Sequence, residues 1–120
     1  DADSQFLEGK MALSQGNIPA AREAFRSAAK LAPEQTEYRS FVAWTDFLEG
    51  AALVELALQA LQDASAADAS DMRAPHFLGL AAERLGNLAD AKAAFAEAAR
   101  RAPGNPEVQN ALARLTGETG

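Results

Sequence analysis

Apolar residues recur at helical spacing in successive segments of the chain, and each segment is bounded by glycine, asparagine or proline. In the first segment the apolar face consists of Phe6, Leu7, Met11 and Leu13. Gly16 follows this face, and glycine readily adopts the left-handed conformation in which many helices end. The pattern therefore predicts a helix that ends just before Gly16.

A second helix is expected directly after this glycine. Asn17 is a favourable N-cap because its side-chain oxygen can accept a hydrogen bond from a free backbone N–H, and Pro19 fits the first turn. Pro33 disfavours the helical conformation in the residue before it, so we expect the helix to stop there. The apolar face between these limits comprises Ala21, Ala24, Phe25, Ala28 and Leu31.

The same two-helix pattern returns seventy residues later. When residues 5–33 are aligned with residues 75–103, eleven of 29 positions are identical. This shift suggests two units of about 35 residues each, with a degenerate copy between the two clear ones. The identities that do not depend on the abundance of alanine are Gly9/Gly79, Gly16/Gly86, Asn17/Asn87, Phe25/Phe95 and Pro33/Pro103.

These residues resemble the tetratricopeptide repeat (TPR), a unit of 34 residues with small residues at positions 8, 20 and 27, a large apolar residue at 24 and proline at 32. The first unit matches with Gly9, Ala21, Ala28, Phe25 and Pro33. The third unit matches with Gly79, Ala91, Ala98, Phe95 and Pro103. The resemblance implies an all-α, TPR-like α-solenoid of three helical hairpins that wind into a right-handed superhelix.

We expect a single domain over residues 1–120. Its repeats would span about 2–35, 36–71 and 72–105, followed by a capping helix over 106–116 that starts at Asn105 and ends at Gly117. Asp1 rather than Met opens the sequence, which suggests a processed chain or a piece of a longer protein.

The middle unit departs from the pattern. Two extra residues enter near Ala51 and Ala52, and Asp46 occupies a position that is usually apolar and packed in the family. Ala69 stands where proline is expected. We interpret the low-complexity segment 64–70 as a frayed helix end and a loop.

In the family, the first helices of the repeats line a concave groove that takes a peptide. The only tryptophan of the chain falls in this set, and aromatic anchors are common binding hot spots. Trp44 either contacts a partner there or packs against neighbouring first helices, and both interpretations stay open. The residues that the resemblance places on the groove are Phe6, Lys10, Leu13, Ser40, Trp44, Phe47, Arg73, His76, Leu80 and Arg84.

One specialised family site is not expected. Chaperone-binding repeats hold a C-terminal carboxylate with lysine and asparagine at fixed groove positions. Phe6 and Phe41 stand at two of those positions here. An apolar groove with mixed charge is the expectation instead.

Composition agrees with a helical fold. The chain contains 30 alanines, the strongest helix former, and only four β-branched apolar residues. The net charge is −6, and no Lys or Arg lies between Arg39 and Arg73, a stretch with six carboxylates. This acidic stretch disfavours nucleic acid and anionic membranes as partners, and we interpret it as a solvated surface. No apolar run is long enough for membrane insertion.

Nothing in the sequence favours an enzyme or a cofactor. His76 is the single histidine and cysteine is absent, which argues against thiolate or multi-imidazole metal sites and against a Ser–His–Asp triad. Two hypotheses remain: a scaffold that binds a partner peptide or protein segment in the concave groove, and a self-association module that forms a homo-oligomer without a peptide ligand. Alanine and arginine richness suggests a bacterial source, and the cytoplasm is favoured over the periplasm.

Overall fold

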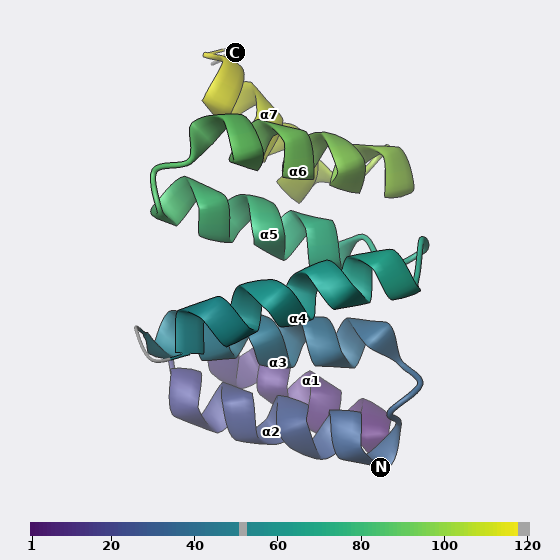
Figure 1. Cartoon of the computed structure of the whole chain (residues 1–120). Coiled ribbons are helices and arrows are strands. Elements are labelled where there is room, and N and C mark those ends of the chain that lie inside the picture. Colours follow the sequence, from purple (N-terminus) through teal and green to yellow (C-terminus); the bar gives the residue numbers. More distant parts are fainter. Residues whose placement is uncertain (51–52, 118–120) are drawn as a thin grey trace.

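A computed structural model describes residues 1–50 and 53–117 of the chain, and these residues form seven α-helices (Figure 1). The two extra residues expected at positions 51 and 52 lie outside the described part. In chain order the helices are α1 (Ala2–Ser14), α2 (Ile18–Leu31), α3 (Thr36–Glu49), α4 (Val54–Ala67), α5 (Arg73–Arg84), α6 (Leu88–Arg101) and α7 (Pro106–Thr116).

The helix ends follow the local sequence. Gly16 and Gly86 have φ values of 77° and 83°, in the left-handed region where a side chain would be strained. Asn17 and Asn105 cap α2 and α7 through their side-chain oxygens. Asn87, at the position equivalent to Asn17, makes no such hydrogen bond, so the α6 cap differs from the expectation.

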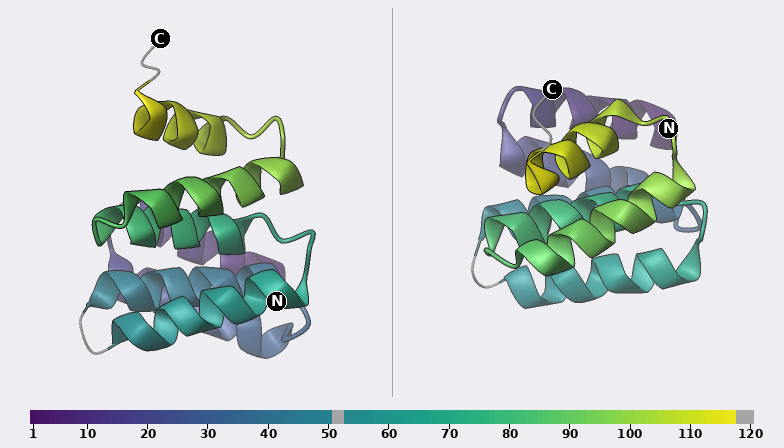
Figure 2. Two further views of the ribbon diagram at one scale, coloured as in Figure 1. Left: turned by 45° about the horizontal axis from the view of Figure 1, so that its top comes forward. Right: turned by 90° about the horizontal axis from the view of Figure 1, so that it is seen from above.

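Each helix packs against the next one in the chain, and α3 also packs against α5. The result is a stack with extents of 40 × 29 × 26 Å. Seen from above, α4 lies on the opposite side of the stack from α1, whereas α7 lies on the same side as α1 (Figure 2). The curved, all-α arrangement is that of a TPR-like solenoid.

Small residues allow a large ring to pass close to a helix backbone. Phe25 and Phe95 are fully buried, and each ring lies directly against a glycine of the preceding helix, Gly9 or Gly79. In the middle of the stack Ala43 and Leu61 occupy the equivalent positions, and both are buried. The predicted pairing of small and large positions is therefore present in all three places.

The core divides into two apolar clusters. The larger cluster joins α1–α5 through aromatic rings such as Phe41, which meets Phe6 and Phe77 edge to face at 4.9 Å. The smaller cluster joins α6 and α7 around Phe95. The ring of His76, which is 4% exposed, contacts both clusters through Phe77 and Phe95.

A polar junction connects the α4–α5 loop to its neighbours, where a frayed segment was expected. Helix α4 continues to Ala67, and the carboxylates of Asp68 and Asp71 accept hydrogen bonds from Thr36 and Ser40 of α3. Arg101 of α6 donates to the carbonyl oxygens of Ser65, Asp68 and Asp71. Hydrogen bonds from α3 and α6 thus hold in place a segment whose composition suggests disorder.

The glycine–phenylalanine contact predicts a strong effect of a single methyl group. A Cβ atom at Gly79 would lie 2.5 Å from the Phe95 ring, which is buried and has no room to move. We expect Gly79→Ala to destabilise the protein by about 1–2 kcal/mol, since overpacking outweighs the gain in helix propensity. Urea unfolding monitored by circular dichroism measures this difference.

Gly104→Ala is the matched control, because no atom lies within 4 Å of a Cβ placed at this exposed turn residue. Its stability should stay within about 0.5 kcal/mol of the wild type. A Gly79→Ala protein as stable as this control would show that the close contact with Phe95 does not constrain the fold.

Burial of His76 predicts a loss of stability in mild acid. Burial, together with the nearby Arg73 charge, lowers the pKa of His76 from 6.5 to about 4. The unfolded chain therefore binds a proton below pH 6.5 that the folded chain does not bind, and the free energy of unfolding should fall by about 2 kcal/mol between pH 7 and pH 5. Urea titrations at both pH values test this.

In His76→Leu this dependence between pH 7 and pH 5 should largely disappear. The carboxylates whose pKa values are lowered, such as Asp68 and Glu107, affect stability only at more acidic pH, because their ordinary pKa values are 3.8 and 4.5. An equal pH dependence in wild type and variant would rule out His76 as the origin.

Candidate partner-binding face

The structure divides the ten residues of the predicted groove into two groups. Six have side chains that are exposed or half-buried, and we call these six residues the concave face. The other four are at most 7% exposed and belong to the core. The concave face consists of Phe6, Lys10, Leu13, Arg73, Leu80 and Arg84, and the buried four are Ser40, Trp44, Phe47 and His76.

Trp44 is packed rather than exposed. Its ring stacks on Phe77 with a centroid distance of 5.2 Å and on Phe47 with a centroid distance of 5.6 Å. Only 6% of the residue is accessible. Of the two interpretations left open by the sequence, packing between first helices is the one observed.

Three cations of the concave face each lie over an aromatic ring. The Lys10 ammonium is 5.2 Å from the centroid of Phe6. The Arg73 guanidinium is 5.8 Å from Phe41, and that of Arg84 is 5.5 Å from Trp44. Each ring is attracted to the cation through its electron-rich face, so the positive charges are held close to the aromatic cluster. The surroundings of these cations carry mixed charge, because Glu107 pairs with Arg73 and Glu83 pairs with Arg114.

Two ion pairs attach α7 to α5. Arg73, at the start of α5, donates two hydrogen bonds to Glu107 at 3.1 and 3.3 Å, and it also contacts Nδ1 of His76. Arg114 donates to both carboxylate oxygens of Glu83, near the end of α5. These bonds lower the pKa values of Glu107 and Glu83. Bidentate geometry at both ends of α5 fixes the last helix along the concave side.

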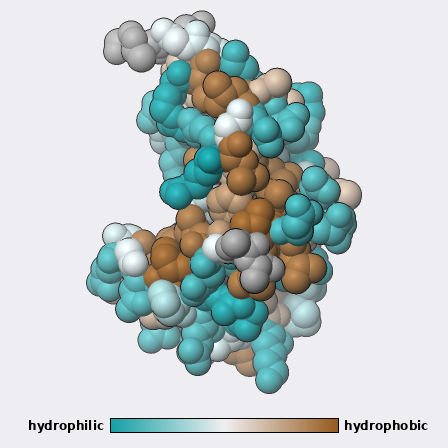
Figure 3. Space-filling view, turned by 60° about the vertical axis from the view of Figure 1, so that its left-hand side comes forward, coloured by the Kyte–Doolittle hydropathy of each residue, from teal (hydrophilic) through white to brown (hydrophobic). Residues whose placement is uncertain are grey.

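The first and last helices of the stack, α1 and α7, lie on the same side of it (Figure 2). In the space-filling view the surface is hollowed between the lower and upper parts of the stack (Figure 3). The concave face is thus a recess bounded by first helices and by α7.

Sequence patterns did not reveal several residues that shape this recess. The Tyr38 hydroxyl donates a 2.6 Å hydrogen bond to Asp3, which raises the pKa of Tyr38 to about 12 and connects α3 to α1. Phe41, which stands at a clamp position of the family, contacts three other phenylalanines and the Arg73 guanidinium. A list of groove positions gives no sign of such contacts, because they depend on how neighbouring helices are rotated.

The interpretation of the acidic stretch as solvated surface needs correction at three residues. Asp71 is 6% exposed and accepts the Ser40 hydrogen bond, and Asp68 binds Thr36 and Ser70. Asp46 pairs with Arg22 of α2 on the side of α3 away from the recess. These carboxylates face partners contributed by other helices, which the charge pattern alone does not show.

The described residues contain no group of three or more His, Cys, Asp or Glu side chains arranged to hold a metal ion. Among the helices in the described ranges, none has the length and hydrophobicity needed to cross a bilayer. The concave face offers aromatic rings, half-buried leucines and cations held over those rings.

Comparison with known proteins agrees with the fold. Residues 76–115 match the family model of the tetratricopeptide repeat. No protein of curated function matches the sequence.

Solved structures match over nearly the whole chain. The TPR domain of Arabidopsis OM64 superimposes with a TM-score of 0.74 at 22% identity, covering 98% of this chain and 95% of that one. The first TPR domain of Spaghetti (RPAP3), bound to the HSP90 peptide SRMEEVD, gives 0.71 at 20% identity, with coverages of 98% and 91%. The Yersinia enterocolitica chaperone SycD, in complex with a YopD peptide, gives 0.68 at 14% identity, with coverages of 98% and 94%.

The regular spacing of small and large residues, the stacked helices and these matches agree with one another. Residues 76–115 match a tetratricopeptide repeat, and the chain as a whole has the fold of a TPR domain.

Proposed function

We propose that the protein is a protein-interaction scaffold and that the concave face holds a segment of its partner. The observation that carries this proposal is the set of three cations fixed over aromatic rings on one recessed surface. Cations held in place by rings and ion pairs lose little conformational freedom on binding, so they form contacts at low entropic cost.

Proteins of the same fold support this proposal. The Spaghetti domain was solved with an HSP90 peptide, and SycD was solved with a peptide of the translocator YopD. Both are matched over more than nine-tenths of their own length. We carry over the general mode, a peptide held by a TPR domain, and not the identity of either peptide.

The accessible groups define the chemistry of the expected partner. Half-buried Phe6, Leu13 and Leu80 offer apolar surface, whereas Lys10 and Arg84 offer charge at the edge. A partner segment would place an apolar side chain on this apolar surface and a carboxylate near the two cations. Arg73 is already paired with Glu107, so its role is mainly to position α7 along the recess.

Trp44 is unsuitable for a first test of this function. Removing a ring that is stacked on Phe47 and Phe77 would leave a cavity and cost about 3–5 kcal/mol, so loss of binding would not be separable from loss of folding. Exposed charges on the same face provide a cleaner test because they contribute little to the core.

Charge reversal of Lys10 and Arg84 should abolish partner capture. In Lys10→Glu/Arg84→Glu two carboxylates replace the two accessible cations, and we expect recovery of partners from a lysate of the source organism to fall at least about tenfold. Affinity purification with quantitative mass spectrometry measures the loss, and circular dichroism confirms that the variant is folded.

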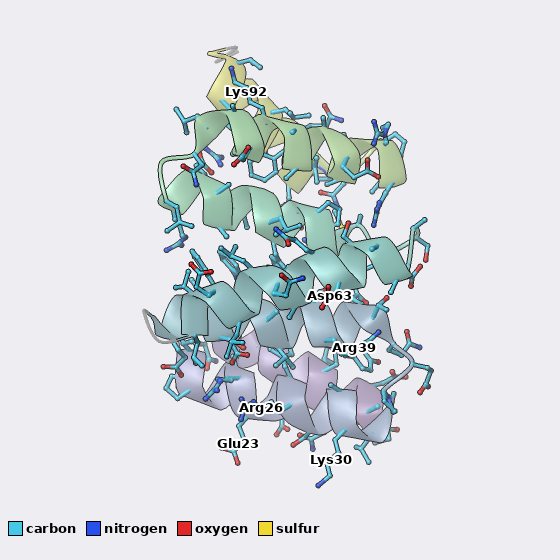
Figure 4. All side chains as sticks on the ribbon, in the orientation of Figure 1. Glu23, Arg26, Lys30, Arg39, Asp63 and Lys92 are labelled. Carbon is cyan, nitrogen blue, oxygen red and sulfur yellow. The ribbon has the colours of Figure 1, made fainter. Side chains whose placement is uncertain are left out.

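The matched control reverses two cations elsewhere on the stack. Lys30 and Lys92 are both exposed, and they extend from the bottom and the top of the view in Figure 4. Lys30→Glu/Lys92→Glu produces the same change in net charge and should retain the partners. If both double variants lose the same partners equally, binding depends on net charge and the concave face is not the site.

A further inference from the structure

A second recess lies outside the concave face. A cleft of about 360 Å³ opens between α4 and α6, and the outward side of α5 forms its floor. Five of its eight lining residues are apolar and three are polar. The lining residues are Leu58 and Gln62 of α4, Leu78, Ala82 and Leu85 on the α5 side, and Asn87, Asp90 and Ala94 on the α6 side.

The floor of this cleft differs from the equivalent surface in the other two units. Three outward positions of each first helix correspond in the repeat register. They are Glu8, Ala12 and Gln15 in the first unit, Val42, Asp46 and Glu49 in the second, and Leu78, Ala82 and Leu85 in the third. Only the third unit has large apolar residues at both ends of this set.

Between α2 and α4, the equivalent surface of the second unit carries charged groups. Arg22 and Arg26 of α2 both pair with Asp46 of α3 there. In the interval between α4 and α6, Ala82 occupies the place of Asp46, and no ion pair among the described residues spans the cleft. The floor of the second interval is therefore available for an apolar partner.

Two large apolar side chains near this cleft are exposed. Leu85 is 48% exposed, and Leu88, just beyond the α5–α6 turn, is 52% exposed. Figure 3 shows hydrophobic surface gathered on the side of the stack where the two helices of each repeat are connected. Contiguous apolar surface at a recess usually marks an interaction site, whereas single exposed leucines need no explanation.

Charge around the cleft is negative. Asp90 lies on its α6 side, and Glu55 is exposed on α4 at helical spacing from Leu58 and Gln62, in a helix without any Lys or Arg. The nearest cations face elsewhere: Arg84 lies over Trp44 at the concave face, and Lys92 points away from α4 in Figure 4.

We propose that this cleft binds an amphipathic helix of a partner protein, with leucine-like residues in the cleft and Lys or Arg beside the acidic rim. A helix fits because the cleft runs between two helices, and because the floor residues Leu78, Ala82 and Leu85 are themselves spaced i, i+4 and i+7. Apolar residues at i, i+4 and i+7 of the partner would then contact Leu58, Leu78 and Leu85. Basic flanks complement Glu55 and Asp90 and disfavour acidic competitors. This site is independent of the concave face.

A defined peptide tests the proposal. The probe is a fluorescent, helix-favouring peptide of about 15 residues, with leucine at i, i+4 and i+7 and lysine on both flanks. Fluorescence anisotropy should give saturable binding to the wild type. Leu85→Glu, which places a charge on the cleft floor, should weaken binding at least about tenfold, and a peptide with glutamate in place of lysine should bind at least about tenfold more weakly.

Leu56→Glu is the matched control, because Leu56 is 70% exposed on α4 but does not line the cleft. This variant should bind within about twofold of the wild type. Lys10→Glu/Arg84→Glu should also bind normally, which separates failure of this proposal from failure of the concave-face proposal. Amide chemical shifts should change around Leu58, Leu78 and Asp90.

Three results would overturn the proposal. The first is unchanged affinity in Leu85→Glu, and the second is chemical-shift changes that fall on Lys10 and Arg84 instead. The third is a wild-type dimer in sedimentation equilibrium that becomes monomeric in Leu85→Glu, because the cleft would then be covered by a second copy of the chain.

Discussion

The close contact between a phenylalanine ring and a glycine of the preceding helix is the constraint on which the stack depends. Gly9 lies against Phe25, and Gly79 against Phe95, at a distance that admits no Cβ atom. Such a contact fixes the rotation of both helices about their axes, because the glycine of one helix must face the ring of the other. This rotation then sets the directions in which the remaining side chains of both helices point.

Two different surfaces follow from this fixed rotation. On one side, aromatic residues of the first helices meet in a continuous cluster whose edge carries Lys10, Arg73 and Arg84. On the other side, the outward positions of the first helices show between the second helices. In the middle unit Asp46 pairs with Arg22 there, whereas Leu78 and Leu85 are left apolar in the third. One repeat register therefore produces a recess that carries cations over aromatic rings and a separate cleft with acidic residues beside it.

Much of the fold could be predicted from the sequence. The helix ends at Gly16 and Gly117, the N-caps at Asn17 and Asn105, and the burial of Phe25, Leu61 and Phe95 are local or register-based features that the structure confirms. The site was less predictable. Family positions place Trp44 and His76 on the groove, yet both are buried, because adjacent first helices pack closely enough to cover them.

The sequence by itself determined the helices, their boundaries and the order of small and large residues, because caps, glycines and periodicity act within a few residues of the chain. Only the tertiary structure decided which charges are free. Asp46, Asp68 and Asp71 look alike in an acidic stretch, but Arg22, Thr36 and Ser40 reach them from other helices. Partners more than twenty residues away leave no local signal, so the pairing that separates a solvated carboxylate from a structural one emerges only when the helices stack.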